Sequence, residues 1–267
     1  MSEEGPEGSQ YKKSCLPYVV KEVEGKGRGL FVIRDIAQAE VILIEDPVLT
    51  IEADMNQNVG SKKLLNDYSK LPPKVQSDIL KLHDAFGMTS QCLETRLWNI
   101  IHTNSIKKWN AGQYLEKSLY LKTSGFNHSC NPNTTWVYKD RTIMIVKALV
   151  PIKRGEELVK DYMWTPFDDR GENGLCREER RAKIKKKYNF DCHCNVCSKN
   201  DPENDKMRRE YLALDRQIGP RLKDGTKEVV DMAEQKLAIG RKTSYALQRL
   251  GGLPESHCCI LQVNRFK

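Results

Sequence analysis

Short runs of alternating apolar and polar residues open the chain and predict a β-rich beginning. The runs "YVVKEV" (18–23), "GLFVIRDI" (29–36) and "VILIEDPVL" (41–49) are rich in Val, Ile and Leu. β-Branched and aromatic residues with a period of two are typical of strands. We therefore expect three strands, with a glycine-punctuated turn at "EGKGRG" (24–29) between the first two.

The spacing of apolar residues changes to three and four between about residues 62 and 118, which predicts helices. Pro72 and Pro73 fit the start of the first helix and Gly87 fits its end. Two apolar stripes with this spacing are expected to face the core: Val75, Ile79, Leu82 and Phe86, then Leu93, Leu97, Ile100 and Ile101.

Strand character returns in "TTWVYKDRTIMIVKAL" (134–149), where Lys139 and Asp140 are expected to form a hairpin turn. A tight turn at Gly155 and a further short strand are expected in "PIKRGEELVKDY" (151–162).

The last third of the chain reads as helical. A basic segment at 177–187 is followed by a cysteine-rich turn, and a second helical segment runs from about Val229 to Ile239. Between them one helix is expected to bury Met207, Tyr211, Leu214 and Ile218 on one face.

Composition limits the classes of protein that fit this pattern. With 267 residues, 39% hydrophobic and 30% charged, the chain is long enough for a sizeable core and is not of disordered composition. No window of about 18 apolar residues exists, so no membrane association is expected. The acidic start "MSEEGPEGSQ" lacks the apolar core of a signal peptide.

The nine cysteines are odd in number and unevenly spaced, which does not fit a secreted disulfide framework. We expect an intracellular, reducing compartment, in the nucleus, the cytoplasm or both. There "NHS" at 127 and "NTT" at 133 are not read as glycosylation sites.

The net charge of +8 is concentrated in "REERRAKIKKK" (177–187), where seven Lys or Arg accompany two Glu. Such a run indicates a partner with an acidic surface, such as chromatin or nucleic acid. A solvated helix with Glu and Arg paired along its exposed side explains the run equally well.

Cys192, Cys194 and Cys197 form a C-x-C-x2-C pattern typical of a metal site. Zinc prefers four ligands in a tetrahedron, so a fourth must come from elsewhere in the chain. Cys130, within "GFNHSCNPNTT" (125–135), is the favoured fourth ligand. Spacing alone does not exclude the alternatives: Cys176, His193, Cys258 and Cys259.

Four motifs in a fixed order resemble the SET-domain protein lysine methyltransferases with a post-SET zinc site. They are "GKGRGLF" (25–31), "NHSCNPN" (127–133), "GEELVKDY" (155–162) and "YNFDCHCNVC" (188–197). Within that family the chain is most similar to the SMYD branch. It lacks the MYND zinc finger expected after the first strands, because residues 50–91 contain no cysteine.

The resemblance implies a mainly β fold with helical inserts, of the α+β class. Small sheets of the β-clip type would surround a threaded pseudoknot, with a helical insert at about 62–118. The expected parts are a flexible tail (1–14), a SET domain (15–175), the basic helix with the post-SET zinc site (176–200) and a short helical C-terminal region (201–267).

The implied activity is transfer of a methyl group from S-adenosylmethionine to a lysine of a histone or another protein. Tyr162 would lie at the transfer site and Tyr188 beside the substrate channel. A structural zinc held by Cys130, Cys192, Cys194 and Cys197 would position Phe190 to stack on adenine. Cofactor contacts are implied for Lys26, Gly27, Arg28, Asn104, Asn127, His128, Tyr162 and Phe190.

Two alternatives remain at this point. A SET fold that binds chromatin or another protein without catalysis would suit a chain with a damaged cofactor motif, yet both the cofactor motif and the tyrosine motif are complete. A zinc-containing nucleic-acid-binding protein would carry Cys and His pairs on a short helical unit, and that arrangement is missing. We expect a monomer that acts on a protein substrate.

Overall fold

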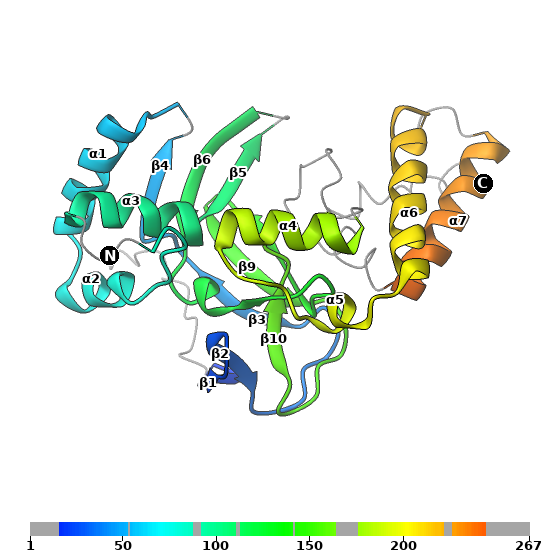
Figure 1. Cartoon of the computed structure of the whole chain (residues 1–267), viewed down its shortest axis with the longest axis horizontal. Helices are drawn as coiled ribbons and strands as arrows, with labels where there is room; N and C mark the ends of the chain where they lie inside the picture. Colours follow the sequence, from blue (N-terminus) through cyan, green and yellow to red (C-terminus); the bar gives the residue numbers. More distant parts are fainter. Residues whose placement is uncertain are drawn as a thin grey trace, which may run out of the picture.

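The structure is a computed structural model that describes residues 16–52, 54–87, 92–110, 113–140, 142–163, 176–221 and 226–243. Three small sheets form the middle of the molecule, with helices at both ends (Figure 1). The expected α+β class is confirmed, although helices contain more residues than strands. Residues 1–14, expected to be a flexible tail, lie outside the described residues.

The first sheet has the order β1-β2-β10-β7. The hairpin of β1 (Tyr18–Val23) and β2 (Gly27–Val32) turns where Gly25 and Gly27 have φ of 70° and 74°. β10 (Glu157–Lys160) pairs antiparallel with β2 and parallel with β7 (Asn127–His128). Positive φ is the backbone region that glycine adopts without strain, so the two glycines permit this turn.

Hydrogen bonds between side chains and backbone atoms hold the segment after β7 beside β10. The Asn133 amide donates to Glu157 O at 2.8 Å and accepts from the Val159 N–H at 2.9 Å. The Thr134 hydroxyl donates to Val159 O at 2.8 Å. These contacts join the end of "NHSCNPN" and the following Thr134 to "GEELVKDY".

The second sheet has the order β3-β9-β8. β8 (Thr134–Lys139) and β9 (Ile143–Ala148) form the expected hairpin, with Asp140 at φ 51°, and β3 (Val41–Glu45) pairs with β9. The main core includes buried side chains from the first and second sheets: Leu30, Val32, Ile42, Leu43, Trp136, Met144, Val146 and Leu158.

The third sheet, β4-β6-β5, packs against three helices at one end of the molecule (Figure 1). Its strands are β4 (Leu49–Glu52), β5 (Ile106–Asn110) and β6 (Gln113–Leu119), and the helices are α1 (Gln57–Ser69), α2 (Pro73–Leu80) and α3 (Leu93–Asn104). A second core joins the two layers: Leu49, Ile51, Leu64, Tyr68, Ile79, Leu97, Ile100, Ile101 and Leu119.

The prediction of one strand over 41–49 was wrong, because β3 and β4 belong to different sheets. Pro47 separates them, and proline has no N–H for a strand ladder. The buried Glu45 carboxylate ends β3 by accepting the N–H groups of Lys122 and Thr123 at 2.7 and 2.9 Å.

The prediction of a helical insert over 62–118 was also wrong at its boundaries. Helix begins at Gln57 and stops at Asn104, and two strands follow because β5 pairs with β6 and β6 pairs with β4. Phe86, expected in the core, is 54% exposed because α2 already ends at Leu80. Leu93 at the start of α3 is 39% exposed.

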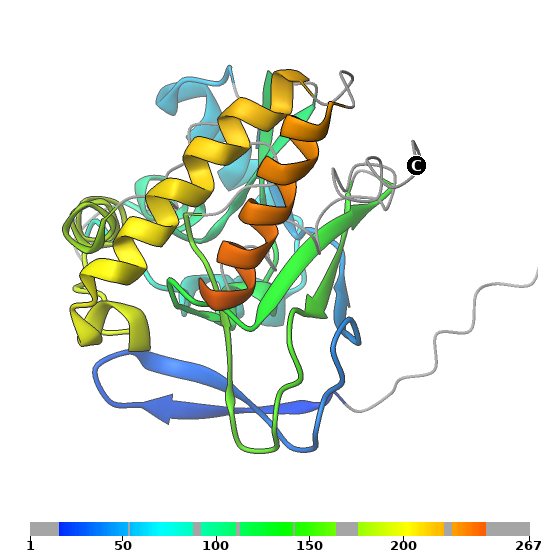
Figure 2. The ribbon, with the colours of Figure 1, turned by 90° about the vertical axis from the view of Figure 1, so that its right-hand side faces the viewer.

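In the part of the chain that the structure describes, four helices follow the sheets: α4 (Arg177–Tyr188), α5 (Asn195–Lys199), α6 (Pro202–Arg221) and α7 (Lys227–Thr243). Figure 2 shows α6 and α7 packed side by side. Their shared core contains Tyr211, Leu214, Ile218, Val229, Ala233 and Ile239, with Met207 partly buried against it. Among the described residues, no helix is long and apolar enough to cross a membrane.

Candidate active site

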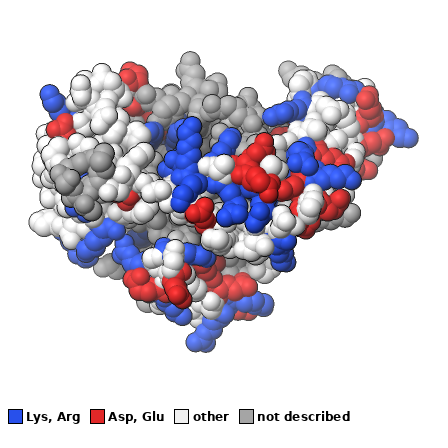
Figure 3. All heavy atoms as spheres, viewed as in Figure 1, with Lys and Arg blue, Asp and Glu red and all other residues white. Residues whose placement is uncertain are grey.

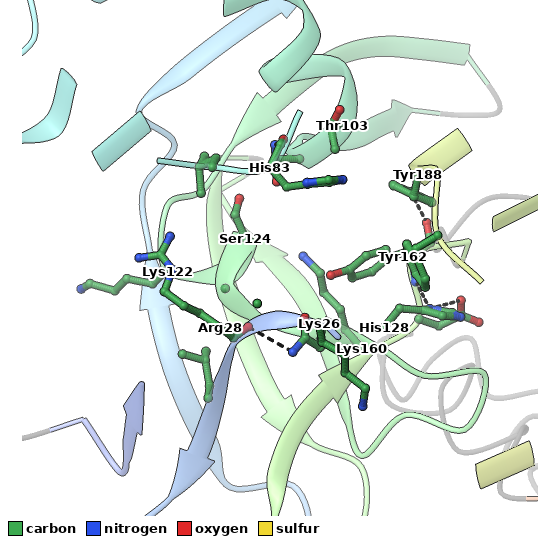
Figure 4. A pocket seen from close by; sticks show the side chains of 18 of the residues that line it. Lys26, Arg28, His83, Thr103, Lys122, Ser124, His128, Lys160, Tyr162 and Tyr188 are labelled. Atoms are coloured by element: carbon green, nitrogen blue, oxygen red, sulfur yellow. Dashed lines mark hydrogen bonds and ion pairs between the residues drawn. The ribbon is translucent and has the colours of Figure 1, made fainter. Parts of the chain in front are cut away.

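A cavity of about 1040 Å³ lies where the first sheet, the end of α3 and the end of α4 meet (Figure 4). Its walls come from segments far apart in sequence, including the β1–β2 turn, residues 121–128 and residues 160–163. Nine residues expected at the active site line it: Lys26, Gly27, Arg28, Asn104, Asn127, His128, Tyr162, Tyr188 and Phe190.

The glycine turn forms one wall, and Asn127 fixes it to the neighbouring strand. The Asn127 amide donates to Arg28 O at 3.1 Å and to Glu157 Oε1 at 2.6 Å. Lys26 Nζ lies 3.6 Å from the other oxygen of Glu157. A Cβ at Gly29 would lie 2.5 Å from Glu157 Oε1, so glycine there permits this close packing.

Asn104 lies at the end of α3 and faces the cavity from the opposite segment. Its amide nitrogen donates to His83 O at 2.7 Å and to Ile100 O at 2.9 Å. Both N–H groups of the amide therefore hold the backbone, and the amide oxygen is the atom able to accept a hydrogen bond from a ligand.

Tyr162 and Tyr188 lie together, with ring centroids 4.9 Å apart. The Tyr162 hydroxyl donates to Phe126 O at 2.8 Å, and the Tyr188 hydroxyl donates to Tyr162 O at 2.9 Å. Burial, followed by the proximity of Tyr188 and Glu157, raises the pKa of Tyr162 well above its ordinary value of 10. The Tyr162 phenol is therefore neutral at physiological pH.

The ring of His128 is buried between the cavity and the cysteines. Its Nδ1 accepts the Tyr162 backbone N–H at 3.1 Å, and its Nε2 lies 3.3 Å from Cys130 Sγ. The ring centroid lies 5.2 Å from that of Tyr162 and 6.1 Å from that of Phe190. Burial lowers the pKa of His128 to about 4, so the ring is neutral at physiological pH.

Cys130 joins Cys192, Cys194 and Cys197 in one cluster whose sulfur atoms all lie within 4.8 Å of one another. Cys130 Sγ is 4.0 Å from Cys192 Sγ and 3.6 Å from Cys197 Sγ, and all four cysteines are free of disulfides. Bonds of about 2.3 Å to a tetrahedral zinc place sulfur atoms about 3.8 Å apart. The donor set and its spacing therefore fit a four-thiolate zinc site.

Of the alternative ligands that the structure describes, Cys176 and His193 are not part of this cluster. Cys176 lies half-buried at the start of α4, where its N–H donates to the Glu179 carboxylate at 2.8 Å. His193 is exposed, and its backbone O accepts a hydrogen bond from the Ser198 hydroxyl. Cys258 and Cys259 lie outside the described residues.

Two almost fully buried arginines flank the cysteine cluster. Arg208 on α6 donates to Cys130 O at 3.0 Å, and Arg180 on α4 pairs with Asp205 at 2.9 Å while interacting electrostatically with Cys130 and Cys197. Four thiolates around a divalent zinc carry two negative charges in excess, and buried charge requires nearby charge of opposite sign. Arg208 and Arg180 place positive charge beside the cluster, and Asp205 balances that of Arg180.

Sequence reasoning missed Lys160 and Asp161, which line the cavity just before Tyr162. Lys160 Nζ donates to Thr123 O at 2.8 Å and lies 5.5 Å from the Tyr162 ring centroid. Burial lowers the pKa of Lys160 to about 8 and raises the pKa of Asp161 to about 6. Lys160 is the last residue of β10, and Tyr162 follows it outside the strand.

Comparison with known proteins agrees with this geometry. The sequence profile of the SET domain matches residues 27–163, just over half of the chain. Human histone-lysine N-methyltransferase SMYD3 is 26% identical over 239 residues, which are 85% of this chain and 51% of that protein. Human N-lysine methyltransferase SMYD2 is 29% identical over 100 residues, 38% of this chain and 21% of that protein.

A SET domain-containing protein of Dictyostelium discoideum is 35% identical over 152 residues, 54% of this chain and 34% of that protein. The chain thus spans about half the length, or less, of these curated relatives. A solved Plasmodium falciparum structure aligns with 56% of the chain at 17% identity and a TM-score of 0.30, too low to support the fold.

The profile match begins within the glycine turn and spans "NHSCNPN" and Tyr162, and the structure gathers these segments around one cavity. It stops before the C-x-C-x2-C turn, and the structure brings this turn to Cys130. The chain therefore belongs to the SET-domain family, and its relatives include lysine methyltransferases of the SMYD group.

Proposed function

We propose that this protein is a lysine N-methyltransferase that uses S-adenosylmethionine to methylate a lysine of a histone or another protein. The observation that carries the proposal is the convergence of the glycine turn, Asn127, Tyr162, Tyr188 and Phe190 on one cavity beside a four-cysteine cluster. Family membership supports methyl transfer to protein lysine in general.

The reaction needs an amine with a free lone pair, whereas a solvated lysine has a pKa of about 10.4. A partly apolar cavity disfavours the ammonium form and so helps the substrate lysine to lose its proton. Bound S-adenosylmethionine would supply an activated methyl group on a sulfonium. Alignment of amine and methyl in one cavity can contribute roughly 7 to 11 kcal/mol to lowering the barrier.

Tyr162 has the properties required at the transfer site. Its hydroxyl hydrogen is directed to Phe126 O, so the hydroxyl oxygen is left as an acceptor towards the cavity. That oxygen can orient the substrate amine and accept weak C–H···O contacts from a polarised methyl group. Tyr188 fixes the backbone of Tyr162 and would line the channel for the substrate lysine.

The other residues around the cavity would bind the cofactor and the zinc. Lys26 and Arg28 would meet the carboxylate of the cofactor, because both are cations on the glycine turn. Phe190 would stack on adenine, and Asn104, Asn127 and His128 would complete its contacts. A structural zinc on Cys130, Cys192, Cys194 and Cys197 would hold the Phe190 segment in place, with no ligand position open for chemistry.

The basic helix gives limited support to a chromatin-facing role. Lys and Arg gather on the face that carries α4 (Figure 3). However, Arg180 is buried, Arg177 donates to Cys197 O, and Lys185 pairs with Asp191 at 3.0 Å, so part of the charge stabilises the fold. We propose that the exposed remainder of this positive charge binds an acidic partner. We also propose that the protein is a monomer and is located inside the cell, in the nucleus, the cytoplasm or both.

The test compares Tyr162→Phe with Tyr138→Phe in a methyl-transfer assay on histones and a cell lysate, with labelled cofactor. Loss of the Tyr162 oxygen should lower kcat by roughly 100-fold or more while cofactor affinity by calorimetry stays within about twofold. Tyr138 lies outside the cavity, and its buried hydroxyl has no hydrogen bond among the described residues, so its variant should keep wild-type activity.

Normal turnover by Tyr162→Phe would show that Tyr162 is assigned the wrong role. Absence of both cofactor binding and transfer in the wild-type protein would instead favour a SET fold that binds proteins without catalysis. Tight DNA binding with a steep salt dependence would favour the nucleic-acid-binding alternative.

A further inference from the structure

We propose that the His128 imidazole is a positioning residue that links the metal site to the reaction centre by bridging the Cys130 thiolate and the Tyr162 backbone N–H. The inference rests on the proposed function for its effect on catalysis. The bridge itself consists of two hydrogen bonds, and their presence can be tested without any catalytic turnover.

The two contacts of the ring fix its tautomer. A backbone N–H can only donate, so Nδ1 of His128, 3.1 Å from the Tyr162 nitrogen, must be the unprotonated nitrogen. A neutral imidazole carries its single hydrogen on the other nitrogen. Nε2–H therefore donates to Cys130 Sγ, 3.3 Å away, and this sulfur acts as the acceptor.

The ring cannot easily turn away from these partners. Its side chain is 1% exposed, and it packs against the rings of Tyr162 and Phe190. β7 pairs with β10, and His128 is the register partner of Lys160. The sheet therefore holds the backbone that carries the His128 ring. An N–H···S bond to a metal-bound thiolate orients that ligand and raises the affinity of the site for its metal.

Tyr162 is held by three hydrogen bonds, two of them to the segment 126–128 and one to Tyr188 at the end of α4. Its hydroxyl is bonded to Phe126 O, its carbonyl to the Tyr188 hydroxyl, and its N–H to His128. The His128 side chain lies 3.3 Å from Cys130 Sγ and so joins Tyr162 directly to a cysteine of the cluster. Displacement of Cys130 would therefore move the backbone that carries the reactive hydroxyl.

The tautomer is checked first on the unaltered protein, by ¹⁵N NMR of the zinc-bound, histidine-labelled chain. We expect the His128 signals of a neutral ring with the hydrogen on Nε2. A hydrogen on Nδ1, or a doubly protonated ring, would overturn the proposal, because neither form can accept the Tyr162 N–H.

The bridge is then removed with His128→Phe, which keeps a ring but neither hydrogen bond. The control is Ile184→Val, a buried change in the apolar core around the cysteines. His128→Phe should release zinc to a chelator roughly 10- to 100-fold faster and shift the thiolate-to-cobalt charge-transfer band of the cobalt-substituted protein. Ile184→Val should change neither. His128→Gln, whose amide can both accept and donate, should partly restore both readouts.

Methyl transfer gives the last comparison. His128→Phe should lower kcat by about tenfold, with KM for the protein substrate little changed, because Tyr162 loses its alignment. Unchanged zinc release and cobalt spectra would refute the bond to Cys130, and altered metal properties with normal kcat would refute the link to Tyr162. If the wild-type chain transfers no methyl group, the proposed function fails while the metal readouts still decide the bridge.

Discussion

Gly29 shows how one missing side chain shapes the proposed cofactor site. A Cβ at this position would lie 2.5 Å from Glu157 Oε1 and 3.2 Å from Asn127 Nδ2, the two atoms joined by a 2.6 Å hydrogen bond. We expect Gly29→Ala to push these side chains apart and to weaken cofactor binding by about fivefold, since a hydrogen bond contributes about 1 kcal/mol. Isothermal calorimetry with S-adenosylmethionine measures the effect.

Gly125→Ala is the matched control. Gly125 also lines the cavity, but its added Cβ would first meet Leu30 at 3.4 Å, an ordinary contact. Its affinity should stay within about twofold of wild type. Equal affinities for the two alanine variants would show that packing at Gly29 does not support the site.

At the residue scale, motif positions were the most predictable part of the site. All nine residues expected at the site outside the metal set line the cavity, and eight of them come from the four motifs. Glu157 and Lys160 were missed, although both lie within "GEELVKDY". Their roles depend on Asn127 and Thr123, which lie more than 25 residues away in the sequence. No local sequence pattern identifies partners at that distance.

The β5–β6 hairpin places like charges in direct opposition. Lys107 and Lys117 are register partners, which destabilises an antiparallel pair, whereas the next pair, Lys108 and Glu116, is joined at 2.8 Å. Burial, then Lys107 and Lys187, lower the pKa of Lys117 to about 8. The folded state therefore binds the Lys117 proton less tightly than the unfolded state does.

This shift predicts a dependence of stability on pH. Between about pH 8 and the ordinary lysine value of 10.5, the unfolded state carries the proton more fully, so the contribution of Lys117 to the free energy of unfolding rises with pH. Below pH 8 the penalty is constant. Lys117→Gln should therefore be more stable than wild type at pH 7, by about 0.5 kcal/mol, with a smaller gain at pH 10.

Urea unfolding at both pH values measures these differences. Lys108→Gln, which removes the paired neighbour instead, should be less stable than wild type at pH 7. A Lys117→Gln variant that is equally stable at pH 7, or less stable, would contradict the proposed repulsion.

At the element scale, periodicity predicted correctly whether most elements are helices or strands. It failed where pairing with another strand decides between the two. The hairpins at 18–32 and 134–148 were predicted because turn residues and alternation agree. The strands at 106–119 were read as helix, since their apolar residues also fit a spacing of three and four. Pairing with β4 supplies the hydrogen bonds that select strand.

Across the whole molecule, the cysteine cluster joins the sheets to the C-terminal helices. Cys130 comes from the segment after β7, the other three from the turn around α5, and Arg208 ties α6 to Cys130 O. Loss of the metal should therefore loosen α5 and the start of α6, while the β8–β9 hairpin retains its own core.

Cys130→Ser tests this coupling. The variant should bind less than one zinc per chain after dialysis against a chelator, melt at a lower temperature and lose hydrogen-exchange protection over 192–208 but not over 143–148. Cys92→Ser is the control, because Cys92 is exposed at the start of α3, where serine is a good helix cap. Wild-type zinc content in Cys130→Ser would show that the fourth ligand is misassigned.

The sequence by itself determined the family, the ordered motifs and most secondary structure, because these depend on local spacing and turn chemistry. It left the fourth ligand open among Cys130, Cys176, His193 and the 258–259 pair. Only the tertiary structure brought Cys130 within 4.0 Å of Cys192, since that contact spans 62 residues and is set by how β7 lies against β10. The same packing turned His128 towards both Cys130 and Tyr162, which no periodicity encodes.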